Sequence, residues 1–205
     1  MRVAVTGSTG RIGSVLLPAL DAAGHDVVRV VRDEAGSGPD AVVWDPVAGT
    51  IDAAGLEGVD AVVHLSGARI GDHRFTEEEK ERLWESRVNT TRLLAETLAG
   101  LDRKPSVLLC ASAIGYYGDR GDVILTEEDG PGDGFLAALC VQWEAATGTA
   151  VEAGIRVVNT RSGLVLRVVL DRMFAPFKAV PFFNPYRLGL GGRLGSGRQY
   201  WSWIA

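Results

Sequence analysis

The sequence predicts an α/β protein built on a doubly wound parallel sheet with helices on both faces. A β-branched run, Val3–Val5, leads directly into three glycines, Gly7, Gly10 and Gly13. Beyond them, short apolar segments alternate with longer amphipathic ones, which is typical of parallel strands joined by crossover helices. The 205 residues suffice for one domain with a sizeable core, or for one domain and part of a second.

The expected elements follow from this alternation. The segments that read as strands are Val3–Val5, Asp26–Val31, Ala41–Trp44, Ala61–Leu65, Val107–Cys110 and Arg156–Asn159. The segments with a helical pattern are Ile12–Ala23, Glu77–Leu98 and Phe135–Ala153. The strands are apolar on both faces, so we expect helices to cover both sides of the sheet. Thr76 is a good N-cap for the second helix, whose acidic first turn suits the positive end of a helix.

The glycine spacing after the first strand indicates a function. A dinucleotide-binding turn needs one glycine for the tight turn, one for backbone approach to a pyrophosphate, and one for close helix packing. The following helix then offers backbone N–H groups to phosphate. We expect a Rossmann-type, cofactor-binding fold; a purely structural glycine turn is the alternative. The residues expected to bind the cofactor here are Gly7, Ser8, Thr9, Gly10, Arg11, Ile12 and Gly13.

The end of the second strand bears on which dinucleotide is bound. An acidic residue there would hold the adenosine ribose, whereas an arginine accommodates a 2′-phosphate. Val31 stands where the acid is expected, and Arg32 follows it. A guanidinium makes a forked, charge-assisted pair with phosphate, so Arg32 favours NADP over NAD. Asp33 leaves two alternatives open, because it could bind ribose or form an exposed pair with Arg32.

Composition limits the partners and the compartment. The formal net charge of −5 and the pI near 5.3 argue against nucleic acid, whose binders usually carry a basic face. No signal-peptide pattern follows Arg2, and no apolar stretch is long enough to span a membrane. We therefore expect a cytoplasmic protein that acts on a small molecule.

Cysteines and histidines give no signal for a metal. Cys110 and Cys140 are too few for a disulfide framework and are better explained by core packing. His25, His64 and His73 lack metal-ligand spacing, and His64 within an apolar strand is better explained as a hydrogen-bonded core residue. We expect no metal site.

The segment beyond Arg167 changes character. Prolines interleave with aromatic residues, and a glycine-rich run leads to Trp201 and Trp203. Exposed aromatics would be costly, so this segment is expected to cover the sheet edge, a substrate cleft or another subunit, as in a homodimer. We divide the chain into a dinucleotide-binding domain, residues 1–166, and a partial substrate-binding region, residues 167–205, that looks truncated.

Several motifs carry a family resemblance that covers nearly the whole chain. They are TGSTGRIG at 6–13, Asp45-Pro46, DAVVHLSGA at 60–68, SRVNTTRLL at 86–94, SAIGYYG at 112–118, WEAA at 143–146, RSG at 161–163, and LGLGG at 188–192 with SWI at 202–204. With them the chain resembles the extended short-chain dehydrogenase/reductase superfamily, and more narrowly its atypical nucleoside-diphosphate-sugar epimerase-like branch.

The resemblance implies roles for several residues. The glycine turn would hold the pyrophosphate, and Val31 and Arg32 the adenosine phosphate. Arg87 would face the cofactor groove; an exposed arginine paired with a nearby Glu is the alternative. Ser112 matches the serine that hydrogen-bonds the reacting oxygen, or is ordinary turn chemistry. The residues expected on the ribose side of the nicotinamide half are Leu65, Ser66, Gly67 and Ala68.

The chain departs from the family at the catalytic pair. Catalytic members use a Tyr as the acid/base and a Lys four residues later, on one face of a helix. Aligning on the Trp-Glu pair puts Leu136 and Cys140 at those places, and a shift of one residue gives Phe135 and Leu139. No lysine occurs between positions 104 and 178. Gln142 occupies a position where some relatives have a lysine, and it could hydrogen-bond a ribose without supplying a charge.

Tyr116 and Tyr117 are the substitute proton donors, since they follow Ser112 on a loop expected near the nicotinamide. A tyrosine without a cationic neighbour is a sluggish base at neutral pH, and Arg120 is the nearest candidate in sequence. Aromatic packing is the alternative role for both tyrosines.

Three functions remain open. The first is an NADP-dependent oxidoreductase or epimerase acting on a sugar-nucleotide-like or other small hydroxylated substrate. The second is a non-catalytic NADP(H)-binding sensor or regulatory module, which the missing Tyr/Lys pair favours. The third is an interaction protein with a vestigial nucleotide pocket. Fold alone does not decide among them, because function resides in the site.

Overall fold

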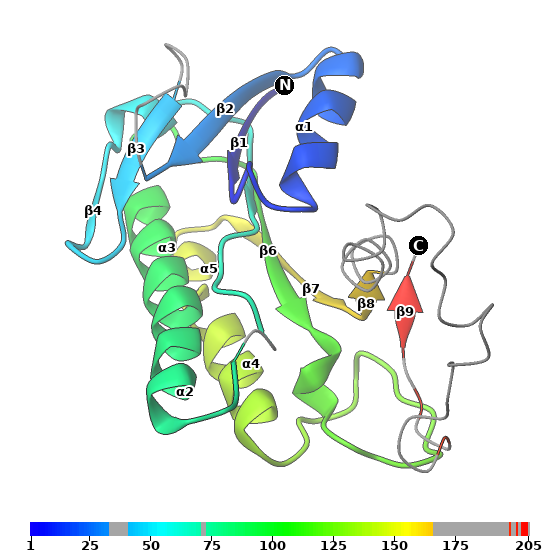
Figure 1. Ribbon diagram of the computed structural model, residues 1–205. Helices are drawn as coiled ribbons and strands as arrows, with labels where there is room; N and C mark the ends of the chain where they lie inside the picture. The colour runs from blue at the N-terminus through cyan, green and yellow to red at the C-terminus, as the bar shows by residue number, and fades with distance from the viewer. Residues whose placement is uncertain (33–40, 71–72, 166–196, 198–199, 201, 205) are drawn as a thin grey trace, which may run out of the picture.

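A computed structural model describes residues 1–32, 41–70, 73–165, 197, 200 and 202–204. Within them lies a seven-stranded sheet whose strands are β1 (Arg2–Thr6), β2 (Asp26–Val31), β3 (Ala41–Asp45), β4 (Thr50–Ile51), β5 (Ala61–His64), β6 (Val107–Ala113) and β7 (Arg156–Ser162). The helices of the described part are α1 (Gly13–Ala22), α2 (Glu77–Trp84), α3 (Thr90–Gly100), α4 (Phe135–Ala145) and α5 (Gly148–Glu152). Two short strands, β8 (Leu164–Val165) and β9 (Trp203–Ile204), pair separately (Figure 1).

The strand order is β4-β3-β2-β1-β5-β6-β7, and every pair is parallel except β3 with β4. The chain runs outward from β1 to β2 and β3, then returns to β5 on the other side of β1. Thr6, at the end of β1, lies opposite Val30 of β2 and His64 of β5. Ligands of open α/β sheets bind where the strand order reverses, at the carboxyl ends of the strands. That point here is the crevice between β1 and β5, so the Rossmann-type fold is confirmed.

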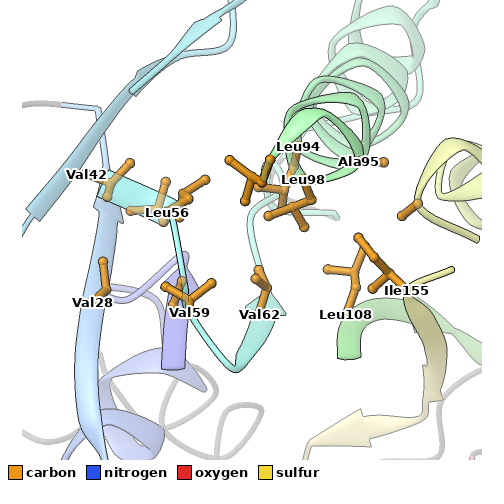
Figure 2. Packing of buried hydrophobic residues seen from close by; sticks show 14 of the residues in the cluster. Val28, Val42, Leu56, Val59, Val62, Leu94, Ala95, Leu98, Leu108 and Ile155 are labelled. Atoms are coloured by element: carbon orange, nitrogen blue, oxygen red, sulfur yellow. The ribbon is translucent and has the colours of Figure 1, made fainter. Parts of the chain in front are cut away.

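Helices cover both faces of the sheet. On one face, buried side chains of the strands, such as Val28, Val62 and Leu108, pack against Leu94 and Leu98 of α3 (Figure 2). On the other face, Leu16, Leu17 and Leu20 of α1 pack against strand residues. Each fully buried aliphatic side chain contributes roughly 1.5–3 kcal/mol, so these two layers hold the strand ends in place.

Two expected helices are each divided in the structure. The segment Glu77–Leu98 forms α2, then a π-helical turn over Glu85–Asn89, then α3. The segment Phe135–Ala153 is interrupted before Gly148 and forms α4 and α5. The sheet also gains β4, which the sequence analysis did not predict. Asp45 starts that hairpin by accepting hydrogen bonds from the amides of the second and third residues after it, at 2.9 and 3.0 Å.

His64 is wholly buried and hydrogen-bonded through both ring nitrogens, in agreement with the expected core role. Its Nδ1 lies 2.7 Å from Thr6 Oγ1, and its Nε2 lies 3.0 Å from Thr91 Oγ1. Thr6 Oγ1 already accepts from the amides of Leu65 and Ser66, so its own proton goes to Nδ1 and the imidazole carries its proton on Nε2. Burial lowers the pKa of His64 to about 4.

Two other expectations concern residues that lie wholly or mostly outside the described part of the chain. The proposed boundary at residue 166 and most of the aromatic segment fall outside the described residues. Within the described residues, every helix is too short or too polar to cross a bilayer.

The pKa of His64 predicts a pH dependence of stability. Because the folded pKa, about 4, lies below the ordinary value of 6.5, the unfolded chain binds more protons between these values. The free energy of unfolding should therefore fall as the pH drops from 6.5 to 4, with this residue contributing up to about 3 kcal/mol. Urea unfolding across this range measures the effect.

The exposed His73 provides the control, because His73→Gln should leave the slope unchanged. An NMR titration of the wild-type protein gives a measurement that does not depend on a variant. A His64 ring that becomes protonated near its ordinary pKa would contradict the prediction.

Candidate functional site

The glycine turn between β1 and α1 is built without room for side chains. Gly7 has φ +66°, and a Cβ there would lie 2.9 Å from the carbonyl carbon of Leu65 on the β5 side. A Cβ on Gly13 would meet the carbonyl oxygen of Gly7 and would lie 2.8 Å from Ser8 Cα. Gly10 N donates to Gly7 O at 2.9 Å, which closes the turn. The helix therefore starts close to the end of β5, at the topological switch point.

The start of α1 is open to solvent. Residues 9–12 are exposed, and Ile12 supplies no side-chain cap to the helix amides. By contrast, Thr76 Oγ1 caps α2 by accepting from Glu79 N at 3.2 Å. An uncapped helix start offers its N–H groups to an anion. This arrangement suits the role predicted for the residues of the turn.

Two arginines, Arg29 within β2 and Arg32 directly after it, belong to the strand that lies beside β1. Arg32 is exposed directly after β2, and Val31 before it is half-buried. Arg29 was not predicted as a site residue, yet its Nε donates to Ser8 Oγ at 3.4 Å. It therefore brings a positive charge to the glycine turn. Its position in the middle of a strand gave no hint of this contact.

The loop after β5 is held by the π-helical turn. Ala68 N donates to Ser86 Oγ at 3.0 Å, and Arg87 Nη2 donates to Ala68 O at 2.8 Å. Arg87 is 6% exposed and its guanidinium lies 5.1 Å from the centre of the Trp143 ring. Burial lowers the pKa of Arg87 to about 10, so it is charged at neutral pH. The alternative of an exposed arginine in an ion pair is therefore wrong.

Ser112 makes a hydrogen bond that the sequence analysis did not predict. It is buried near the end of β6, and its hydroxyl donates to Glu144 Oε1 of α4 at 2.6 Å. The same carboxylate accepts from Arg161 of β7, at 2.9 Å from Nε to Oε1 and 2.8 Å from Nη2 to Oε2. This forked ion pair raises the pKa of Arg161 above its ordinary value.

Tyr116 and Tyr117 both contact Arg161. Arg161 Nη1 donates to the phenolic oxygen of Tyr117 at 2.9 Å. The guanidinium also lies over the Tyr116 ring, 3.4 Å from its centre, while the two rings meet edge to face. Arg120, the cation considered from the sequence, instead donates to the carbonyl oxygens of Gly130 and Pro131. The cationic neighbour of Tyr117 is therefore Arg161 of β7, 44 residues away in sequence.

Neither register of the alignment places a Tyr/Lys pair on α4, because the candidate positions hold Leu136 and Cys140 or Phe135 and Leu139. A Cβ on Gly115 would lie 3.6 Å from Leu136 Cβ and 3.8 Å from Cys140 Sγ, so both face the loop after β6. Burial raises the pKa of the Cys140 thiol, which keeps it protonated. Gln142 is exposed and does not line the pocket. A helix turns about 100° per residue, so Gln142 points away from both Cys140 and Glu144.

A large open pocket lies between the π-helical turn, α4, β7 and the loop after β6. Its walls include Arg87, Tyr117, Glu144, Asn159 and Arg161. Among the described residues, two buried polar side-chain atoms have no hydrogen-bond partner, Arg87 Nε and Asn159 Oδ1. Both belong to residues of this pocket. A buried donor and a buried acceptor without partners each cost about 1–3 kcal/mol, which a bound ligand can recover.

The missed residues, Glu144 and Arg161, stood within motifs that carried the family resemblance, WEAA and RSG. Their pairing joins a helix to a strand 17 residues later, and neither spacing nor periodicity could reveal it. Within the ranges that the structure describes, no group of His, Cys, Asp and Glu is arranged to hold a metal ion.

Comparison with protein families gives one match over most of the chain. The sequence profile of the NAD dependent epimerase/dehydratase family matches residues 3–165. The chain is 45% identical over 206 residues to an epimerase family protein of Mycobacterium tuberculosis, covering 99% of this chain and 64% of that protein. It is 36% identical over 211 residues to the human epimerase family protein SDR39U1, covering 100% of this chain and 66% of that protein. The chain thus spans about two thirds of the length of these relatives.

Two solved structures share the arrangement. Human SDR39U1 with NADPH superposes with a TM-score of 0.80 at 35% identity, covering 100% of this chain and 65% of that chain. A nucleoside-diphosphate sugar epimerase from Corynebacterium glutamicum gives a TM-score of 0.78 at 37% identity, covering 100% of this chain and 41% of that chain.

The tight packing of Gly13 predicts the cost of a side chain there. Gly13→Ala should lower the free energy of unfolding by about 1–3 kcal/mol, because the new methyl group meets backbone that cannot move aside easily. Gly100→Ala is the matched control, since nothing lies within 4 Å of its Cβ position, and it should change stability by less than about 1 kcal/mol. Chemical denaturation compares the two. Equal stability of both variants would show that Gly13 is not tightly packed.

Proposed function

This chain belongs to the NAD dependent epimerase/dehydratase family, and on that premise we propose that it is an NADP-dependent oxidoreductase or epimerase. The proposed substrate is a sugar nucleotide or another small hydroxylated compound. The observation that carries the proposal is the glycine turn, packed against the end of β5 at the switch point of the sheet.

The residues of the turn fit a dinucleotide. A Cβ on any of the three glycines would meet backbone atoms, and the exposed residues 9–12 lead into α1, whose first amides receive no side-chain cap. The pyrophosphate would lie against these amides, which have the geometry and partial charge to bind an anion. Ser8 would be held for this contact by Arg29.

The preference for NADP rests on charge. Arg32 follows β2 directly and Arg29 reaches the turn from the same strand, so positive charge surrounds the place of the adenosine 2′-phosphate. The solved structure of human SDR39U1 contains NADPH, which supports the same choice.

The nicotinamide half would lie along the loop Leu65–Ala68. Arg87 holds that loop through Ala68 O and keeps one buried donor, Nε, without a partner. Asn159 supplies a buried acceptor in the same pocket. The ribose hydroxyls and the carboxamide of the nicotinamide half each offer an acceptor for Arg87 Nε and a donor for Asn159 Oδ1. Gln142 has no part in this arrangement, because it lies outside the pocket.

The chemistry assigned to the site is reversible oxidation at a carbon that bears a hydroxyl group. A bound nicotinamide supplies or accepts the hydride. Tyr117 lines the pocket and would exchange a proton with the substrate oxygen. Ser112 is buried and holds Glu144, so its role is to position that carboxylate. Tyr116 supports the guanidinium of Arg161 with its ring.

A sensor that binds NADP(H) without turnover is the second candidate. Leu136 and Cys140 favour it, because neither can perform the work of the Tyr/Lys pair. The two candidates share the cofactor site and differ in whether Tyr117 acts on a substrate.

The charge at the end of β2 predicts cofactor selectivity. Calorimetry should show NADPH binding at least about tenfold tighter than NADH, and Arg32→Gln should remove most of that difference, since one charge-assisted contact is worth about 1.5–3 kcal/mol. Arg92→Gln is the control, because Arg92 is exposed on α3. Equal or better affinity of the wild-type protein for NADH would overturn the NADP assignment.

The position of Tyr117 predicts its effect on turnover. Tyr117→Phe should lower the rate of NADPH-dependent conversion of nucleoside diphosphate sugars by about 10²–10⁴-fold, and should change NADPH affinity by less than about threefold. Tyr116→Phe keeps the ring beneath Arg161 and should have a smaller effect. Unchanged turnover in Tyr117→Phe would remove this residue from the mechanism. NADPH binding without any turnover in the wild type would favour the sensor.

A further inference from the structure

The pocket contains a cation in direct contact with the phenol of Tyr117. Arg161 Nη1 donates to Tyr117 Oη at 2.9 Å, and the guanidinium lies 5.1 Å from the centre of the Tyr117 ring. The phenolic oxygen accepts this bond, so the phenolic proton remains available to a group in the pocket. The family's lysine has no counterpart on α4, where Leu136 and Cys140 stand.

Glu144 fixes the direction of this guanidinium. Its two carboxylate oxygens accept from Nε and Nη2 of Arg161, at 2.9 and 2.8 Å, which leaves Nη1 for Tyr117. Ser112 holds the carboxylate from the other side at 2.6 Å. The side chains of Arg161 and Glu144 are only 19% and 14% exposed, so little solvent screens the pair. The ring of Tyr116 closes one face of the guanidinium.

We propose that Arg161 takes the place of the missing lysine as the cation that supports Tyr117, and that Glu144 and Ser112 are positioning residues for it. This inference rests on the proposed oxidoreductase or epimerase function, because it assigns a partner to the proposed proton donor. Three segments contribute to the unit: β7, α4, and the end of β6 with its following turn.

The proton transfer balances within these groups. When a carbonyl group of the substrate is reduced, its carbon would take the hydride that a bound nicotinamide supplies, the O–H bond of Tyr117 breaks, and a new O–H bond forms on the carbonyl oxygen. The remaining phenolate carries one negative charge, which the N–H of Arg161 stabilises through a charge-assisted hydrogen bond. In the opposite direction the phenolate accepts the proton of the substrate hydroxyl.

Other groups of the described pocket are less suited to support the phenol. Arg120 donates to two backbone carbonyls of its own loop, and Cys140 is a thiol whose pKa is raised by burial. The titratable group nearest to the phenol in sequence is Tyr116, whose ring meets that of Tyr117 edge to face. The other charged and titratable groups of the described pocket are Arg161 of β7, Glu144 and Cys140 of α4, Asp119, Arg120, Asp122, Glu127 and Asp133 of the loop after β6, Lys80 of α2, Arg87 and Tyr200. Of these, Arg161 makes the hydrogen bond.

The test compares neutral substitutions of two residues of opposite charge, Arg161 and Glu144. Ring-labelled tyrosine NMR on the full chain without cofactor gives the phenolate-to-phenol ratio of Tyr117 at one alkaline pH, the same for every variant. The resonance is assigned by its loss in Tyr117→Phe. Arg161→Gln should lower the ratio by about tenfold, and Glu144→Gln should raise it by a similar factor. A purely structural role would not move the ratio in opposite directions.

Further variants test whether the charge of Arg161 causes the change in the ratio. Arg161→Lys retains the cation and should restore most of the phenolate, while the control Arg120→Gln should leave the ratio within about twofold of the wild type. If Arg161→Gln does not fold, Arg161→Met and Glu144→Gln carry the test. A ratio unchanged in the Arg161 variants, or moved in the same direction by both substitutions, would overturn the proposal.

A second measurement separates this inference from the proposed function. NADPH titration by calorimetry is done on the same variants, because the phenolate ratio is measured without cofactor. Shifts of opposite sign support the inference whether or not NADPH binds, and absence of NADPH binding in the wild type would contradict the proposed function alone. NADPH binding with no shift in the ratio would overturn the inference alone.

Discussion

A buried hydrogen-bond chain through His64 ties the ends of β1 and β5 to α3 and to α4, the helix that lines the pocket. The imidazole links Thr6, at the end of β1, to Thr91 of α3, and Thr91 Oγ1 also accepts from Trp143 Nε1 of α4 at 3.0 Å. Because these groups are buried, losing one partner leaves another unsatisfied at a cost of about 1–3 kcal/mol. The ends of two strands and two helices are therefore fixed relative to each other.

The two sides of the pocket depend on this anchor through Trp143. On one side its ring lies beneath Arg87, which in turn holds the loop after β5. On the other side the next residue, Glu144, binds Ser112 and Arg161. A shift of α4 would thus disturb both the loop after β5, held by Arg87, and the turn that carries Tyr116 and Tyr117. The fold places both halves of the site with one hydrogen-bond chain.

The sequence was sufficient to predict the architecture and the tight glycine turn between β1 and α1. Strand patterns and the spacing of Gly7, Gly10 and Gly13 depend on local geometry, which a sequence displays directly. The π-helical turn that buries Arg87 could not be predicted in this way, because helix periodicity continues through it. The same holds for the contact of Arg161 with Tyr117, which exists only after β6 and β7 have paired. Side chains whose partners come from distant segments need the tertiary structure, and most of the predicted chemistry concerns such residues.

Arg87 and Arg161, which both line the pocket, differ in how their charge is balanced. Arg161 has its own carboxylate, and a partly buried ion pair of this kind adds little net stability, since desolvation offsets most of the attraction. Its value lies in the fixed direction of the guanidinium toward Tyr117. Arg87 forms hydrogen bonds only with uncharged oxygens and keeps Nε without a partner. The charge of Arg161 is thus balanced within the protein, whereas Arg87 keeps a buried donor without a partner among the described residues. The proposed function makes use of this difference, with a cofactor bound beside Arg87 and a proton transferred beside Arg161.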